Sequence, residues 1–387
     1  MFQPEMPSRE ILETLVGFNS VSSNSNLPLL NWIEDYLVSF DLEPIKVFDE
    51  TGEKANLFVT IGPEANNGYI LSGHTDVVPV EGQDWATDPF TLTEKDGKLF
   101  GRGSCDMKGF LACVLAAVPS MVKAPLKRPI HLAFSYDEEV GCIGVRRLID
   151  DLNTKGFKAE ACFVGEPTDM QVIVAHKSKA SYTAIFTGLS CHSSLAPHGV
   201  NAVQYGARLV SKLEQMGAAL AAGPHDELFD MPYSTAHTGV MRGGTALNIV
   251  PDHCEVVFEF RVLPTESLHA CVEEIERHAM EDLLPQMRAV SPEANIEFIP
   301  ASEIQGLNTN AEAEVSILAK KLAGRNDHAK VAYGTEAGLF QNVLGVPTVV
   351  CGPGSIEQAH KPDEFIKISE LDKCDKFLNK LIEHASR

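Results

Sequence analysis

The sequence predicts an α/β domain with a mostly parallel sheet, into which a second, α+β domain is inserted. Over residues 1–179 and again over 301–387, short apolar runs of strand length alternate with helical segments, which is typical of crossovers between parallel strands. Residues 180–300 instead follow the order β-α-β-β-α-β, the split pattern of a ferredoxin-like domain. The 387 residues are enough for both domains.

The elements of the outer domain follow from hydrophobic spacing. Strands are expected where apolar runs are short and bounded by turn residues, at 56–62, 69–73, 130–135, 161–166 and 347–352. Helices are expected where apolar residues recur at helical spacing, at 27–40, 108–122 and 314–323. The segment 108–122 is apolar nearly all round, so we expect it to be buried.

The elements of the inserted domain show amphipathic patterns. Strands are expected at 181–188, 238–250, 254–262 and 294–300, with helices at 201–216 and 267–284. In the third strand, alternate residues are apolar and should share one buried face: Val256, Phe258, Phe260 and Val262.

Composition excludes several classes of protein. The chain has 32 basic and 53 acidic residues, a net charge of −21, which argues against nucleic acid or an anionic membrane as a partner. Its apolar runs fall short of the roughly 18 residues of a membrane span. Nine cysteines without a C-x-x-C pair, and an N-terminus without a signal-peptide pattern, predict reduced thiols and a cytoplasmic location.

Side chains that bind metals follow the ends of the predicted strands. His74 and Asp76 follow one strand, the acidic run Asp137–Glu139 follows another, and Glu166 ends a third. The carboxyl ends of parallel strands meet at one edge of a sheet, so we expect these groups to converge.

Two further residues complete this set. Asp106 lies in a glycine-rich turn before the buried helix, and His360 follows the last apolar strand. Carboxylates and imidazoles suit a pair of zinc ions, with cobalt or manganese as alternatives. Taken singly, each residue also fits an ordinary role, for example a helix N-cap for Asp106 or a solvated loop acid for Glu166.

Five motifs in order along the chain resemble those of a known family. They read GHTDVVP (73–79), GRGSCDMKG (101–109), DEEVG (137–141), GEPT (165–168) and AHKPDEF (359–365). Together they are similar to the dinuclear zinc aminoacylase and carboxypeptidase family, which includes acetylornithine deacetylase and succinyl-diaminopimelate desuccinylase. The resemblance implies a three-layer zinc-peptidase-like catalytic domain and an inserted dimerisation domain.

The resemblance also implies a role for each residue of the metal centre. Asp106 would bridge two divalent ions, His74 and Glu166 would complete one site, and Glu139 and His360 would complete the other. Asp76 would orient His74, and Glu138 would act as the general base. Two cations would supply the positive charge that adjacent ionised carboxylates require. Asp137 matches a position without a ligand role and is expected to be structural.

The inserted domain would contribute to catalysis and to dimerisation. GLSCHSSLAPHGVNA (188–202) resembles a family segment whose histidine, here His192, stabilises the oxyanion in the partner subunit's active site, which implies a homodimer. Without the flanking match, His192 would be an ordinary loop residue. The stretch lacks the final glycine of a nucleophile elbow, so we reject a serine hydrolase.

The resemblance suggests four substrate-binding residues. Asn248 and Arg261 match positions that hold the substrate's carboxylate and carbonyl, and Thr335 and Glu336 match pocket residues, with Glu336 placed to attract an ammonium group. Arg261 as a surface ion-pair partner and Glu336 as a solvated loop acid remain open alternatives.

The implied activity is a metal-dependent amidohydrolase reaction on a small N-acetylated amino acid. The stretch YGTEAGLF (333–340) resembles the acetylornithine-specific members, which implies release of acetate from N2-acetylornithine in arginine biosynthesis. The alternatives within the class are succinyl-diaminopimelate desuccinylase, a general N-acyl amino acid amidohydrolase and a dipeptidase. A noncatalytic amino-acid-binding protein on the same scaffold is the alternative from another class.

Overall fold

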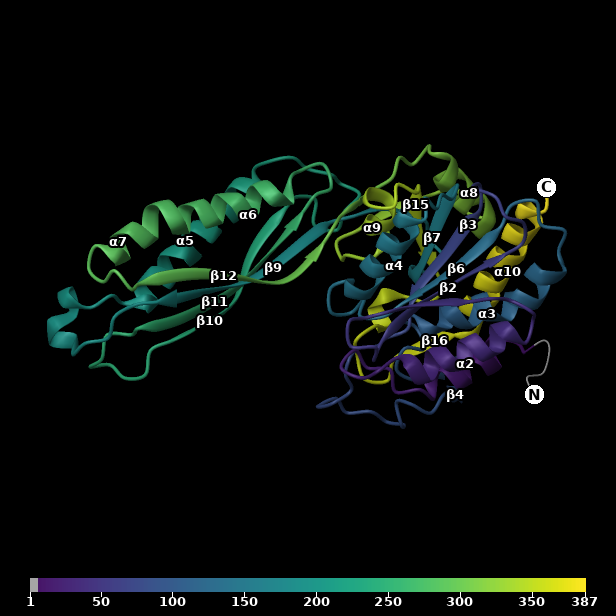
Figure 1. Cartoon of the computed structure of the whole chain (residues 1–387), viewed down its shortest axis with the longest axis horizontal. Helices are drawn as coiled ribbons and strands as arrows, with labels where there is room; N and C mark the ends of the chain where they lie inside the picture. The colour runs from purple at the N-terminus through teal and green to yellow at the C-terminus, as the bar shows by residue number, and fades with distance from the viewer. Residues whose placement is uncertain (1–5) are drawn as a thin grey trace. The chain divides into compact units, whose positions relative to one another are not determined.

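Residues 6–387 are described by a computed structural model, and they form two units (Figure 1). Unit 1 contains the residues up to Ala175, together with 307–330 and 335–387. Unit 2 contains residues 176–306 and 331–334. The sequence analysis placed the inserted segment at 180–300, whereas the main segment of unit 2 begins at His176 and ends at Gly306.

A nine-stranded sheet is the centre of unit 1. Its order is β1-β2-β6-β3-β7-β15-β8-β13, with β14 paired to β8. The strands are β1 (Ile45–Phe48), β2 (Ala55–Ile61), β3 (Tyr69–His74), β6 (Ile130–Ser135), β7 (Ala161–Pro167), β8 (Ile173–His176), β13 (Leu307–Asn308), β14 (Ala329–Val331) and β15 (Thr348–Gly352). The central strands β6, β3, β7 and β15 are parallel, and β1, β2 and β8 pair antiparallel. The predicted mostly parallel α/β architecture is confirmed.

Helices cover both faces of this sheet (Figure 1). On one face they are α1 (Ser8–Val16), α2 (Leu27–Val38), α3 (Lys108–Lys123), α8 (Glu314–Ala323) and α10 (Ile368–Ala385), and on the other α4 (Ile143–Thr154) and α9 (Ala337–Asn342). Side chains alternate between the faces along each strand. Leu71 and Leu132 therefore enter the core under α3, whereas Asn56 donates a hydrogen bond to the carbonyl of Gly144 on α4. The result is a three-layer domain.

Glycine allows α3 to approach the sheet closely. A Cβ atom on Gly165 would lie 2.1 Å from the ring of Phe110, and one on Gly73 would lie 2.6 Å from Cε of Met107. Both glycines precede residues of the predicted metal centre, so the close packing of α3 fixes the strand ends that carry His74 and Glu166.

A small antiparallel sheet completes unit 1. It contains β4 (Thr93–Lys95), β5 (Lys98–Phe100) and β16 (Phe365–Lys367) in the order β16-β5-β4. Because β16 begins at the last residue of the AHKPDEF segment and β5 ends just before the GRGSCDMKG segment, this sheet brings those two segments together.

Unit 2 is a four-stranded antiparallel sheet with helices. The sheet order is β10-β11-β9-β12, which with the chain order β-α-β-β-α-β gives the ferredoxin-like topology predicted from the sequence. The strands are β9 (Ser178–Thr187), β10 (Thr235–Gly243), β11 (His253–Val262) and β12 (Asn295–Ile304), and the helices are α5 (Ala202–Ala221), α6 (Leu268–Arg277) and α7 (Leu284–Arg288). A π-helical segment, His278–Leu283, joins α6 to α7, and a short 3₁₀ helix covers Ser193–His198.

The core of unit 2 lies between the sheet and its helices. Val256, Phe258, Phe260 and Val262 are all buried, as their alternation predicted. The strand expected over 238–250 was wrong in its second half, because β10 ends at Gly243 and Gly244 has a φ of +79° that turns the chain.

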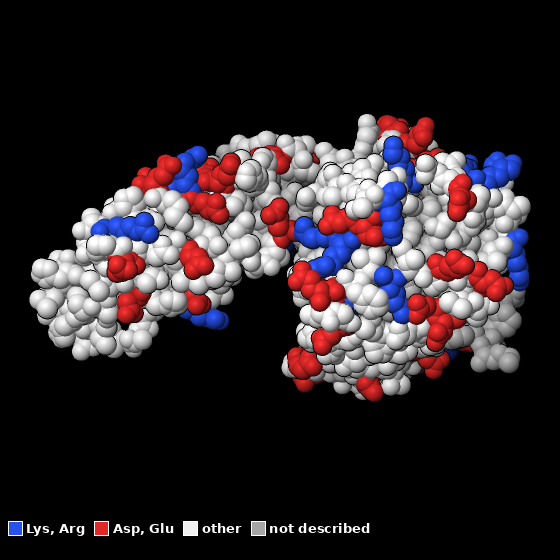
Figure 2. Space-filling view, viewed as in Figure 1, with Lys and Arg blue, Asp and Glu red and all other residues white. Residues whose placement is uncertain are grey.

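The surface charge agrees with the acidic composition. Figure 2 shows acidic side chains scattered over the visible face, with lysine and arginine interspersed among them. Within residues 6–387, every helix is too short or too polar to cross a membrane.

Candidate active site

The structure brings all five predicted metal ligands together at the carboxyl edge of the sheet in unit 1. His74 is the last residue of β3, Glu166 lies near the end of β7, and Glu139 follows β6. Because β6, β3 and β7 are neighbouring parallel strands, their ends coincide. Asp106 precedes α3, and His360 follows the short 3₁₀ helix Ile356–Gln358.

Asp106 lies between the two histidines. Its Oδ1 is 3.1 Å from Nε2 of His74, and its Oδ2 is 3.3 Å from Nε2 of His360. On the His360 side, Oε2 of Glu139 is 3.0 Å from the same Nε2. On the His74 side, Oε2 of Glu166 is 3.9 Å from the imidazole. Each carboxylate oxygen of Asp106 thus faces a different His–Glu pair, as a residue shared by two cations requires.

The site concentrates negative charge away from water. Burial raises the pKa of Glu139 to about 7, with Asp106 adding to the shift, and burial together with Asp106 raises that of Glu166 to about 8. Burial, reinforced by Glu166, also raises the pKa of Glu138 well above its usual value. Hydrogen bonds to Asp106 and Glu139 raise the pKa of His360 to about 10. Among the described residues, the two histidines are the groups that lie against these carboxylates with positive charge.

The donor set fits divalent cations. His74, Asp106 and Glu139 each offer a ligand atom within 4.8 Å of the others, and so do His74, Glu138 and Glu166. Oε1 of Glu139 is buried without a hydrogen-bond partner among the described residues. A buried carboxylate oxygen normally has a partner, and a divalent cation held by this donor set would supply one.

Asp76 organises this edge through its backbone as well as its side chain. Its carbonyl oxygen lies 2.9 Å from Nδ1 of His74, and its carboxylate oxygen lies 3.6 Å from the same atom. The carboxylate accepts hydrogen bonds from the backbone N–H groups of Glu138 and Glu139, at 3.1 and 3.3 Å, and from the hydroxyl of Ser22. Asp76 therefore connects the ligand on β3 to the acidic segment after β6.

The three adjacent acids have different partners. Lys54 donates to both carboxylate oxygens of Asp137, at 2.7 and 2.8 Å. Oε1 of Glu138 accepts from Sγ of Cys142 at 3.3 Å. Asp137 thus has a cationic partner within the protein, while Glu138 and Glu139 face the ligand cluster.

Thr335 and Glu336 are buried, each 1 % exposed. The Glu336 carboxylate accepts hydrogen bonds from the hydroxyls of Ser72 and Ser135, at 2.6 and 2.7 Å, and the Thr335 hydroxyl accepts from the N–H of Ala337. Ser72 and His74 point to the same face of β3. This burial excludes the solvated loop acid as the role of Glu336, and its contact with a substrate ammonium group stays a prediction.

The other three predicted residues lie in unit 2. His192 and Asn248 are exposed and neighbour one another, since the N–H of Ser193 donates to the carbonyl of Asn248 at 3.0 Å. Arg261 on β11 donates to Glu259 at 2.9 Å and to the carbonyl of Ala332 at 3.3 Å. The structure therefore brings two of these three residues together.

Sequence reasoning missed two buried charged residues beside the ligands, Arg102 and Glu364. Each is 1 % exposed, and Nη1 of Arg102 lies 2.8 Å from Oε2 of Glu364. Both belong to motifs quoted above, GRGSCDMKG and AHKPDEF. An arginine between two glycines, four residues before the proposed ligand Asp106, was the available signal.

The three-layer fold and the clustered histidines and carboxylates define a metal-dependent hydrolase. The chain belongs to peptidase family M20/M25/M40, because the sequence model of that family matches residues 70–384. It is 34 % identical to acetylornithine deacetylase of Photorhabdus laumondii over 98 % of this chain and 97 % of that protein. It is 35 % identical to acetylornithine deacetylase of Proteus mirabilis over 92 % of this chain and 88 % of that protein.

Solved structures agree on the fold. The M20 family metallo-carboxypeptidase Sso-CP2 of Sulfolobus solfataricus is 20 % identical, with a TM-score of 0.78 over 98 % of this chain and 99 % of that one. The aminopeptidase PepT of Bacillus cereus is 23 % identical, with a TM-score of 0.75 over the whole of both chains. The predicted family and enzyme class are confirmed.

Proposed function

We propose that this protein removes the acetyl group from N2-acetylornithine, giving ornithine and acetate in arginine biosynthesis. The observation that carries the proposal is the match, over nearly the full chain, to relatives named acetylornithine deacetylase. The arrangement around Asp106 supports hydrolysis by two divalent ions, for which zinc is our assignment and cobalt the alternative.

In this proposal the ligands divide into two sets that share Asp106. His74 and Glu166 would hold one ion, and Glu139 and His360 the other. The chemistry supplied by cations held there is polarisation of the amide carbonyl and activation of water. Asp76 keeps the imidazole of His74 oriented through the contact at Nδ1, so that Nε2 faces the cluster.

Glu138 is the proposed proton carrier. Its Oε1 is engaged by Cys142, so we assign proton transfer to Oε2. Glu138 would take a proton from the attacking water and deliver it to the departing amine, as amide hydrolysis requires. The backbone N–H held by Asp76 fixes the position of the residue.

Unit 2 would supply the remaining groups. We propose that His192 stabilises the oxyanion in the partner subunit of a homodimer, and that Asn248 and Arg261 bind the substrate's carboxylate and carbonyl. The exposure of His192 and Asn248 and their adjacency support this role. A cytoplasmic location is part of the same proposal.

The test compares initial rates on four substrates with added zinc or cobalt. Acetylornithine should be hydrolysed fastest, with equal amounts of acetate and ornithine released, and chelation should abolish the reaction. Faster turnover of succinyl-diaminopimelate, acetylmethionine or a dipeptide would replace the substrate assignment with the corresponding activity. Binding of these compounds without hydrolysis under every metal condition would indicate a noncatalytic binding protein.

A further inference from the structure

The buried pair Arg102–Glu364 joins two segments that carry proposed metal ligands. The Glu364 carboxylate accepts four hydrogen bonds from the segment that leads to Asp106. Oε1 accepts from the N–H groups of Cys105 and Asp106, at 2.8 and 3.0 Å. Oε2 accepts from the N–H of Gly103 at 3.0 Å and from Arg102 at 2.8 Å. The backbone N–H of Asp106 is thus hydrogen-bonded directly to the Glu364 carboxylate.

Arg102 holds the segment around His360 in turn. Its Nη1 donates to the carbonyl of Lys361 at 3.3 Å, and its Nη2 donates to the side chain of Gln83. Gln83 donates to the carbonyl of His360 at 3.1 Å. The backbone at and after His360 is therefore tied, directly or through Gln83, to the same guanidinium.

The two histidine ligands differ in how they are supported. His74 ends a central strand, is 1 % exposed, and is positioned by the sheet itself. His360 lies outside helices and strands, its side chain is 54 % exposed, and its φ is +63°. A non-glycine residue in that region of φ needs support from its surroundings. The bonds from Gln83 and Arg102 supply it.

We propose that Arg102 and Glu364 are positioning residues that set the affinity of the cation site formed by Asp106, Glu139 and His360. The inference rests on the proposed two-metal function. Without the pair, Asp106 and His360 lose their common anchor and this site weakens. The other site shares Asp106 but takes His74 and Glu166 from sheet strands, so it changes less.

Glu364→Gln is the first variant. A glutamine of the same size offers one oxygen and one NH₂ group, so it must turn a donor toward backbone donors or toward Arg102. Arg102→Lys is the second, because it keeps a positive charge beside Glu364 but removes the planar fork that reaches the Lys361 carbonyl and Gln83.

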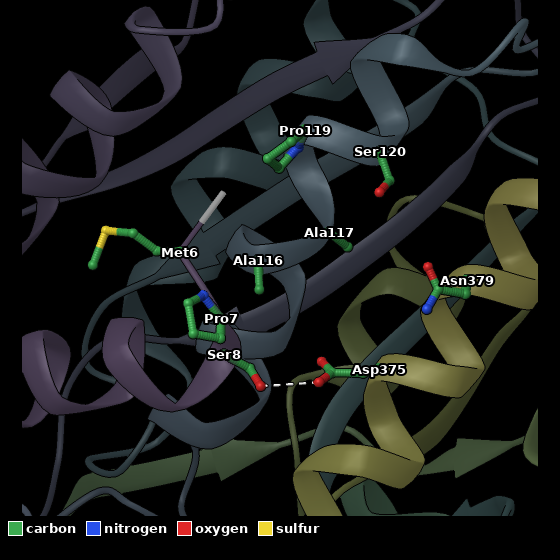
Figure 3. Close-up of a pocket in the computed structure, with 9 residues that line it drawn as sticks. All are labelled: Met6, Pro7, Ser8, Ala116, Ala117, Pro119, Ser120, Asp375 and Asn379. Atoms are coloured by element: carbon green, nitrogen blue, oxygen red, sulfur yellow. Dashed lines mark hydrogen bonds between the residues drawn. The ribbon is translucent and has the colours of Figure 1, made fainter. Parts of the chain in front are cut away.

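Asp375→Asn is the matched control. This partly buried carboxylate on α10 accepts a hydrogen bond from Ser8 at 2.9 Å, beside a pocket between α1, α3 and α10 (Figure 3). Its partner Ser8 belongs to neither ligand segment.

Zinc and cobalt binding are measured by titration in metal buffers, with the visible absorption of Co²⁺ reporting the coordination of each ion. Wild type and Asp375→Asn should bind two ions per chain with the same affinities. Both pair variants should bind the first ion within about 3-fold of wild type and the second at least about 10-fold more weakly. Excess metal should restore kcat with KM unchanged.

Wild-type affinities for both ions in a folded Glu364→Gln or Arg102→Lys protein would overturn the inference. Equal weakening of both sites would overturn its selectivity. If Glu364→Gln does not fold, Arg102→Lys decides alone, and a failure of both to fold while Asp375→Asn folds would show a role in stability and reject the inference. A wild-type protein that binds fewer than two ions would refute the proposed function instead.

Discussion

Metal binding should tighten as the pH rises from 6 to 8, because protons and cations compete for the same side chains. A carboxylate must lose its proton before it binds a cation. In the metal-free protein, burial and nearby carboxylates place the pKa of Glu139 at about 7 and that of Glu166 at about 8. Both values are above the ordinary 4.5 of a glutamic acid.

The size of the effect follows from these values. At pH 6, Glu139 is about 9 % ionised and Glu166 about 1 %, and at pH 8 the fractions are about 91 % and about 50 %. The apparent affinity should therefore rise about 10-fold for the ion bound by Glu139 and about 50-fold for the ion bound by Glu166. His360, whose pKa is about 10 beside Asp106 and Glu139, also releases a proton, so the figure for the ion bound by Glu139 is a lower bound.

The stability of the fold should also depend on pH, with opposite signs in the metal-free and the metal-bound protein. The raised pKa values mean that the metal-free folded protein binds more protons than the unfolded chain between about pH 4.5 and 8. Its stability should therefore fall as the pH rises through this window. Added zinc should raise Tm more at pH 8 than at pH 6, because the ligands are then ionised.

Calorimetric titration in buffers of different ionisation enthalpy counts the released protons, and competition with a chelator gives the affinities. Glu139→Gln removes one of the titrating carboxylates, so it should flatten the pH dependence of one ion only. Affinities that stay constant between pH 6 and 8, with no proton release, would refute the reasoning.

Three further predictions concern single side chains. Glu138→Gln should lower kcat by about 10²- to 10⁴-fold with metal content unchanged, measured by turnover and elemental analysis, and a near-normal rate would contradict the proton-carrier role. Gly165→Ala should lower the free energy of unfolding, measured with denaturant, by about 1–3 kcal/mol, because its Cβ would lie 2.1 Å from the Phe110 ring. The control Gly217→Ala, inside α5, should be neutral or stabilising, because its Cβ would have no neighbour nearer than 3.5 Å. Glu336→Ala should cost about 1–3 kcal/mol in denaturant unfolding, because the Ser135 hydroxyl loses its acceptor and Ser72 keeps only the carbonyl of Ala133. Glu336→Gln tests the proposed contact with the substrate's ammonium group: KM for acetylornithine should rise, and an unchanged KM would contradict the contact.

The sequence determined the elements and the ligand types because both are local properties. Apolar runs located β3, β6, β7 and β15 to within a residue or two, since a buried strand requires consecutive apolar residues. The sequence also predicted the order β-α-β-β-α-β of unit 2. The end of β10 is set by backbone conformation, because the positive φ of Gly244 turns the chain there. Apolar patterning does not reveal such a turn, so the predicted strand was too long.

Only the tertiary structure decided the partners of each charged group. The sequence could propose Asp106 as a shared ligand through resemblance, but the separation of its two oxygens toward His74 and His360 depends on how α3 packs against the sheet. The sequence proposed Glu336 as a pocket residue, but only the packing of β3 and β6 shows that the hydroxyls of Ser72 and Ser135 donate to its carboxylate.

The pair of Arg102 and Glu364 illustrates the same limit. Glu364 bonds to backbone N–H groups, which every non-proline residue carries, so no side-chain pattern reveals these contacts. Their presence depends on the small sheet that brings β5 and β16 together from distant parts of the chain. The sequence determined which side chains were available, and the long-range packing of strands and loops decided which atoms they face.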